Sequence, residues 1–182
     1  RTLGTFLVQI DNANVYIINS SADSVFDRVE NGQPVDANGR TSLRAAVMRA
    51  NEVAGEQIIV IPEGTYLLTI AGADEDSGST GDLDLTGDIQ LLGTSPANTI
   101  SATTPPTTVI DARRRDRVFE ISSAAAVTLS GLTIKGGSAT TGGGIRNSGA
   151  LQLIDSRVTA NISQRAGGGI ENRGVIEIER SW

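Results

Sequence analysis

The 182-residue chain contains no cysteine and no histidine, and it has only three Phe, two Tyr and one Trp. The absence of cysteine excludes a disulfide framework and thiolate metal sites, although it does not fix the cellular compartment. Without histidine or cysteine, an enzyme would have to work with Asp/Glu pairs, Arg, one Lys and two Tyr. We therefore expect no catalytic residues and no bound cofactor or metal.

Positive charge and long apolar runs are also scarce. Fifteen Lys and Arg against 21 Asp and Glu give a net charge of −6, which leaves no broad basic surface for a nucleic acid. No run of 18 or more apolar residues occurs, so we expect no transmembrane segment. Because the chain begins at Arg1 and its only methionine is Met48, we expect that the sequence either has lost an N-terminal piece, as in secretion, or is a fragment.

The apolar residues are mainly Ile, Val, Leu and Ala, which favours stacked strands lined by aliphatic side chains. From residue 56 to residue 182 the sequence consists of short apolar runs of three to five residues, separated by Gly, Pro, Asn and Ser. No segment between these runs is long enough for a crossover helix, so we do not expect a βαβ sheet.

The first 55 residues have a different pattern. Residues 1–18 predict an N-terminal strand segment, and residues 19–40 predict a polar surface loop with turns at Asn31-Gly32 and Asn38-Gly39. Residues 41–54 have apolar side chains at helical spacing, a Thr or Ser to cap the start and Gly55 to end the helix. We expect this helix to cover the open N-terminal end of a single domain spanning residues 1–182.

An internal repeat decides the fold class. GGGIRNSGALQLIDS starts at Gly142 and GGGIENRGVIEIERS starts at Gly167, 25 residues later, so that Ile145 matches Ile170 and Asn147 matches Asn172. VTLSGLTI at residue 127 matches LQLIDSRV at residue 151 in the same way. A repeat of this length is typical of a solenoid.

About 25 residues are enough for one three-sided coil of short strands and corners. We therefore predict an all-β protein, a right-handed parallel β-helix with one N-terminal capping α-helix. Glycine would turn the corners, the paired Ile would stack inside, and the paired Asn would form a ladder. The residues with these structural roles are Gly143, Gly144, Ile145, Asn147, Gly168, Gly169, Ile170 and Asn172.

Leucine-rich repeats are the alternative, because LSGLTIKGG and LIDSRVTAN partly match their spacing, but Ser156 stands where Leu is expected.

Four parts of the sequence carry a family resemblance. Thr41-Ser42-Leu43-Arg44-Ala45-Ala46, IVIPEGTYLLTI from Ile59, GDLDL from Gly81 and the GGGI-x-N units resemble CSLREA-domain proteins and polymorphic outer-membrane proteins. Thr41 and Ala45 replace the Cys and the Glu of the family motif. The resemblance implies a β-helix of the pectin-lyase-like type in a secreted or surface protein of bacteria. Related β-helices include enzymes that act on acidic polysaccharides.

Two charged segments are candidate sites. ADEDSGSTGDLDL contains Asp74, Glu75, Asp76, Asp82 and Asp84, and this segment predicts a solvated turn, a calcium site or a carboxylate pair for glycoside hydrolysis. ARRRDRVFE contains Arg113, Arg114, Arg115 and Arg117, which predict a solvated loop or a grip on sugar carboxylates.

Together these features predict a non-catalytic extracellular or cell-surface module with a structural or adhesive role. The sequence stops inside a repeat, at Trp182, so either it is truncated or another molecule covers that end. With the strand-like TFLVQI near the start, the second alternative leads us to expect head-to-tail self-association into a filament. Cell-surface glycans are a second expected partner. The alternative is a carbohydrate-active enzyme or a carbohydrate-binding module.

Overall fold

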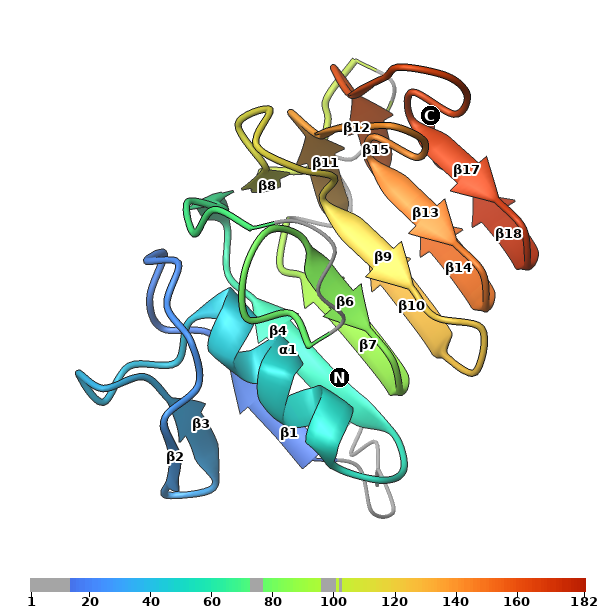
Figure 1. Cartoon of the computed structure of the whole chain (residues 1–182). Helices are drawn as coiled ribbons and strands as arrows, with labels where there is room; N and C mark the ends of the chain where they lie inside the picture. Colours follow the sequence, from blue (N-terminus) through green and yellow to red (C-terminus); the bar gives the residue numbers. More distant parts are fainter. Residues whose placement is uncertain (1–13, 73–76, 96–100, 102) are drawn as a thin grey trace, which may run out of the picture.

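The computed structural model describes residues 14–72, 77–95, 101 and 103–182 (Figure 1). Strands dominate the described part, and its only helix lies near the N-terminus. All strand pairs except the β2–β3 hairpin and one isolated bridge are parallel. The predicted all-β class with one N-terminal helix is confirmed. Residues 1–13, to which most of the predicted N-terminal strand segment belongs, lie outside the described residues.

Three parallel sheets contain most of the strands. The first has six strands, in the order β1 (Asn14–Ile17), β4 (Gln57–Ile61), β7 (Asp88–Gly93), β10 (Ala126–Ser130), β14 (Ala150–Ile154) and β18 (Val175–Glu179). The second has four, in the order β15 (Arg157–Thr159), β11 (Leu132–Lys135), β8 (Thr108–Asp111) and β5 (Gly64–Leu67). The third also has four, in the order β17 (Ile170–Asn172), β13 (Ile145–Asn147), β9 (Phe119–Ile121) and β6 (Leu83–Leu85). A small parallel pair joins β12 (Ser138–Ala139) to β16 (Ile162–Ser163).

From β4 onward, the chain visits these three sheets in a constant order. Each passage runs from the six-stranded sheet to the sheet of β5, then to the sheet of β6, and back to the six-stranded sheet. Every return adds a strand beside the previous one, as β10, β14 and β18 illustrate in Figure 1. Residues 24 to 44 positions apart therefore become neighbours across strands, and the spacing settles at 24 to 26 positions in the later strands.

Alternating side chains form the core between the sheets. In the six-stranded sheet, Ile59, Leu91, Leu129 and Leu153 pair in register and are almost completely buried. In the sheet of β6, β9 and β13, Leu83 and Phe119 pair in register and are completely buried. Each fully buried side chain of this kind contributes about 1.5–3 kcal/mol. The core is thus a stack of similar layers.

The helix α1 (Leu43–Glu52) begins after Ser42, whose hydroxyl accepts a hydrogen bond of 3.0 Å from the Ala45 amide. This is an N-cap, one of the two that the sequence predicts. Leu43, Ala46, Val47 and Ala50 bury their shared face in the core. The helix contacts β3, β4 and β6, so it lies at the end of the molecule where β1 lies (Figure 1).

A short hairpin interrupts the predicted loop over residues 19–40. Strands β2 (Arg28–Glu30) and β3 (Gln33–Val35) pair antiparallel around Asn31 and Gly32, which both have positive φ, 50° and 76°. Two central residues with positive φ favour a tight hairpin turn. The turn at Asn31-Gly32 was predicted, but the two flanking strands were not, because they have three residues each and no apolar alternation.

Glycine makes the close approach between neighbouring passages feasible at the GGG triplets. Gly142 has φ of 58°, and a Cβ added to Gly143 would lie 2.0 Å from the Ile162 carbonyl oxygen. A contact this short requires the backbone to move. Alanine at position 143 would therefore separate the GGG segment from β16.

Candidate functional site

Two surfaces of the molecule bring polar side chains together. The first is the outer face of the six-stranded sheet, where the side chains that do not enter the core form cross-strand rows. Gln90, Thr128, Gln152 and Glu177 lie in one such row on β7, β10, β14 and β18. Ala126, Ala150 and Val175 lie in the adjacent row, beside Asp88.

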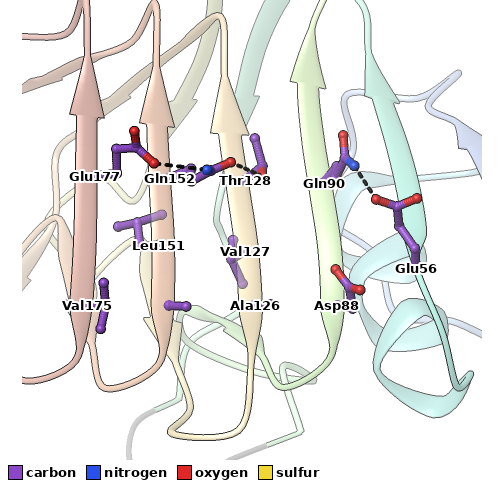
Figure 2. Close-up of a pocket in the computed structure, with 11 residues that line it drawn as sticks. Glu56, Asp88, Gln90, Ala126, Val127, Thr128, Leu151, Gln152, Val175 and Glu177 are labelled. Atoms are coloured by element: carbon purple, nitrogen blue, oxygen red, sulfur yellow. Dashed lines mark hydrogen bonds between the residues drawn. The ribbon is translucent and has the colours of Figure 1, made fainter.

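A groove of 410 Å³, which we call the outer groove, runs across these strands (Figure 2). Its floor is low at Ala126 and Ala150, because these side chains are the smallest in their row. The volume lies in the range of ordinary ligand sites. The lining residues are Glu56, Asp88, Gln90, Ala126, Val127, Thr128, Ala150, Leu151, Gln152, Val175 and Glu177.

Hydrogen bonds hold most of the polar side chains of the outer groove in place. The Thr128 hydroxyl donates to Gln152 Oε1 over 3.4 Å, and Gln152 Nε2 donates to Glu177 Oε2 over 3.0 Å. On the other side, Gln90 Nε2 donates to Glu56 Oε1 (Figure 2). The groove therefore presents a preformed row of amide, hydroxyl and carboxylate groups that can exchange hydrogen bonds with a ligand.

The second surface is an acidic cluster at β6 and β9, formed by Asp82, Asp84 and Glu120. One carboxylate oxygen from each residue lies within 4.8 Å of the others. Asp84 and Glu120 come together because they are register partners on adjacent strands. Asp82 precedes β6, and both aspartates are almost completely buried.

Arg117 is the cation of this acidic cluster. Its Nε lies 2.7 Å from Asp82 Oδ2 and 3.2 Å from Glu120 Oε2, and Arg146 makes a further ion pair with Glu120. The Arg117 Nε–H does not point at either oxygen, so Asp82 Oδ2 has a charge partner but no directed hydrogen bond. A divalent cation held by the same three carboxylates would have to displace the guanidinium.

Burial and crowding raise the pKa of Asp82 to about 8. The largest cause is the loss of water around the buried carboxyl, and the neighbouring carboxylates of Asp84, Asp116 and Glu120 add to it. The charge of Arg117 lowers the pKa but does not offset these effects. A pKa of about 8 favours the protonated form of Asp82 at neutral pH, which reduces the negative charge of the acidic cluster.

A buried arginine on α1 positions the segment that carries Asp82. Arg44 is completely buried, and its Nε pairs with Asp23 Oδ1 over 2.6 Å. Its two terminal nitrogens donate to the carbonyl oxygens of Gly78, Gly81 and Asp82 over 2.8–3.1 Å. With the additional Arg44 Nη2 bond to Asp23, all five N–H donors of the guanidinium are used. Arg44 thus holds residues 78–82 over the end of β6.

The acidic cluster borders a groove on the surface of the molecule. A groove of 340 Å³ beside it is lined by Asp84, Glu120 and Arg146 together with four hydroxyl side chains, Thr86, Ser122, Ser123 and Ser148. Asp82 does not line this groove, and the Gly78 amide covers Asp84 through a hydrogen bond of 2.9 Å to Oδ2. A ligand in this groove meets Asp84, Glu120 and Arg146, whereas Asp82 lies behind them and outside the lining.

The structure places the candidate residues of the two charged segments differently. Asp74, Glu75 and Asp76 lie outside the described residues, whereas Asp82 and Asp84 belong to the acidic cluster. In the arginine segment, Arg113 and Arg114 form a turn with positive φ, and Arg117 turns inward to the acidic cluster. The arginines therefore do not act as one group.

The repeat residues lie in register. Ile145 pairs with Ile170, and Asn147 pairs with Asn172, whose Oδ1 accepts a hydrogen bond of 2.6 Å from Asn147 Nδ2. The Gly144 amide donates to the carbonyl oxygens of Gly168 and Gly169 over 3.2 and 3.0 Å. Gly143 donates to Gly167 over 3.1 Å. These residues support the stack and do not line either groove.

Sequence reasoning missed Arg44 and the outer groove. Arg44 stands inside the resembled motif, but its partners lie 21 to 38 positions away and no spacing marks them. The outer groove depends on which side chains are small in each row, which only the register shows. A signal was present in the alternation of Ala126, Thr128, Ala150 and Gln152, which follows from the 24-residue spacing.

No family model, no curated protein and no solved structure matches the chain. The resemblance to CSLREA-domain proteins therefore stays a prediction. In the part of the chain that the structure describes, no helix has the length and apolarity needed to span a membrane.

Proposed function

We propose that the chain is a right-handed parallel β-helix that works as a rigid, non-catalytic adhesive module outside the cell, and that its outer groove binds extended glycans. The observation that carries this proposal is the row of Gln90, Thr128, Gln152 and Glu177 along a groove that crosses successive strands. The groove follows the direction in which the strands stack, so a linear polymer has room to lie along it.

The constant order in which the chain visits the three parallel sheets supports the β-helix. Parallel strands that are adjacent in one sheet and joined by a crossover are almost always connected with right-handed geometry. Each passage contacts only its neighbours, which is the architecture of a solenoid. A rod of this kind suits a role in spacing or adhesion, and the resemblance to CSLREA-domain and polymorphic outer-membrane proteins is consistent with a place at the bacterial surface.

The chemistry of the outer groove supports a glycan ligand. Sugar hydroxyls both donate and accept, and amide, hydroxyl and carboxylate side chains offer both functions in the groove. The low floor at Ala126 and Ala150 gives the apolar face of a sugar ring a surface for contact. The side chains are already hydrogen-bonded to one another, which reduces the entropy lost on binding.

The decisive experiment measures oligosaccharide binding by calorimetry. We expect Gln152→Ala to weaken binding roughly five- to tenfold, because it removes an amide that bridges Thr128 and Glu177. The matched control is Thr65→Ala, which changes an exposed residue of β5 outside both grooves. Equal losses in both variants, or no binding of any glycan by the unmodified protein, would refute the proposal.

A carbohydrate-active enzyme is the second candidate, and the raised pKa of Asp82 beside Glu120 is the observation that favours it. A protonated acid near an ionised carboxylate is the arrangement that glycoside hydrolysis uses. The test is incubation with polygalacturonate, alginate and neutral glycans, followed by detection of new reducing or unsaturated ends. Turnover that Glu120→Gln abolishes would establish this candidate in place of the adhesive module.

A further inference from the structure

The charge of the outer groove selects among glycans. Its lining contains three carboxylates, those of Glu56, Asp88 and Glu177, and no lysine or arginine. Glu56 and Glu177 each accept an amide hydrogen bond, but neither has an ion-pair partner in the described part of the chain. The groove therefore carries uncompensated negative charge.

Asp88 is the most available of the three carboxylates. It is exposed, and its carboxylate has neither an ion pair nor a hydrogen bond among the residues that the structure describes. In Figure 2 it lies beside Ala126, at the low part of the floor. A ligand group that sits on the alanine floor comes within reach of Asp88.

The size of the low floor also limits the ligand. Asp88 on β7 and Val175 on β18 bracket the two alanines, and three strand spacings separate them, roughly 14 Å. This length suits a few consecutive units of a linear polymer rather than a single small ion. The polymer must accept contact with apolar Ala and Val on one side and with carboxylates on the other.

From these observations we infer that the outer groove prefers glycans that carry protonated amino groups, with Asp88 as the principal contact for an ammonium group. This inference rests on the proposed glycan-binding function and names the substrate class of the same groove. Neutral glycans bind more weakly because they leave the carboxylate of Asp88 unpaired. Polyuronates are excluded, because their carboxylates meet those of the groove and the net charge of −6 of the whole chain.

The experiment compares three probes of equal length: a glucosamine hexamer, its fully N-acetylated counterpart and a galacturonate hexamer. Binding is measured by calorimetry at mildly acidic pH and low salt, where sugar amines are protonated and screening is weak. We expect the glucosamine hexamer to bind roughly tenfold more tightly than the N-acetylated hexamer and the galacturonate hexamer not to bind. The preference should decline as salt is added.

Two variants test whether the carboxylate of Asp88 is the charge that causes the preference for the amine. Asp88→Asn keeps the shape of the side chain and should abolish the preference for the amine while it leaves binding of the N-acetylated hexamer within twofold. The control Glu63→Gln removes the same charge from an exposed position outside both grooves and should leave the preference intact. Circular dichroism verifies that both variants are folded.

Three outcomes are distinguishable. Equal binding of the amine and N-acetylated hexamers, or a preference that survives Asp88→Asn, overturns the inference but leaves the glycan-binding function standing. Tighter binding of the galacturonate hexamer also overturns it. Absence of binding for all three probes defeats both the inference and the proposed function.

Discussion

The two ends of the described molecule bury polar groups in different ways. Near α1, one guanidinium, that of Arg44, bonds to the Asp23 carboxylate and to three carbonyl groups of residues 78–82, all of them far from Arg44 in the sequence. In the repeats, Asn147 bonds to Asn172, its counterpart in the next repeat, and to the Val175 carbonyl oxygen. In the first arrangement, a single side chain fixes the position of a whole segment. In the second, each repeat contributes its own hydrogen bonds, so the loss of one side chain should reduce stability less.

The strongest way to test this difference is Arg44→Met. The substitution leaves Asp23 as a buried charge and removes the partner of the Gly78, Gly81 and Asp82 carbonyls. Breaking a buried pair on one side costs about 3–5 kcal/mol. We expect a loss of this size in the free energy of unfolding, measured by urea denaturation.

Arg49→Met, on the same helix, is the matched control for Arg44→Met. Arg49 is partly exposed, pairs with Glu52 and lies 6.0 Å from the centre of the Phe26 ring, so the substitution should change stability by less than about 1 kcal/mol. If Arg44→Met is too unstable to purify, the double variant Asp23→Asn with Arg44→Met, which removes the buried charge, should recover part of the loss. A similarly small effect on stability for Arg44→Met and Arg49→Met would contradict the view that Arg44 alone fixes the position of residues 78–82.

The next effect is pH dependence at the acidic cluster, near the α1 end. The folded-state pKa of Asp82, about 8, lies above its ordinary value of 3.8, so the folded state binds this proton more tightly than the unfolded chain does. The stability that the proton supplies is complete below about pH 4 and is lost as the pH rises to about 8. Asn at position 82 has no charge at any pH and mimics protonated Asp82. The Asp82→Asn variant should therefore keep this part of the stability as the pH rises.

Denaturation of the unmodified protein and of Asp82→Asn at several pH values measures this effect. We expect the stability of the unmodified protein to fall by roughly 3–5 kcal/mol relative to the variant between about pH 4 and pH 8. Taking the difference cancels the other carboxylates, including Asp155 and Glu171, whose pKa values are lowered by Arg180 and by the Thr141 side chain, respectively. Parallel curves for the two proteins would show that Asp82 is not protonated at neutral pH.

The same comparison explains how far the sequence could predict the structure. The short strands after Gly55 and the helix start at Ser42 follow local patterns, and the pairing of Ile145 with Ile170 follows the repeat spacing. The contacts of Arg44 do not repeat, so no period marks them. Arg117 belongs to a charged run that suggested a surface loop. Only the register of β6 beside β9 brings Glu120 next to the aspartates, and Arg117 pairs with Asp82 there. Local and periodic features were therefore predictable, and single long-range polar contacts were not.

The smallest expected effect concerns the asparagine ladder of the repeats. Asn147 is completely buried, its Nδ2 donates to Asn172 Oδ1 and to the Val175 carbonyl oxygen, and its Oδ1 accepts from the Gly149 amide over 3.1 Å. Asn147→Ala leaves the Gly149 amide buried without this partner, and we expect a loss of about 1–2 kcal/mol. Asn172→Ala is the matched variant, because it changes the same repeat position where the side chain is exposed.

For Asn172→Ala we expect a change below about 1 kcal/mol, since Asn147 Nδ2 keeps its hydrogen bond to the Val175 carbonyl oxygen and the Asn172 side chain is exposed. Urea denaturation of the two variants gives the difference directly. A loss at Asn147 that approaches that of Arg44→Met would mean that the repeats also depend on single buried polar groups. Equal losses at Asn147 and Asn172 would mean that the hydrogen bond between them, rather than burial, sets the effect, because each substitution removes that bond.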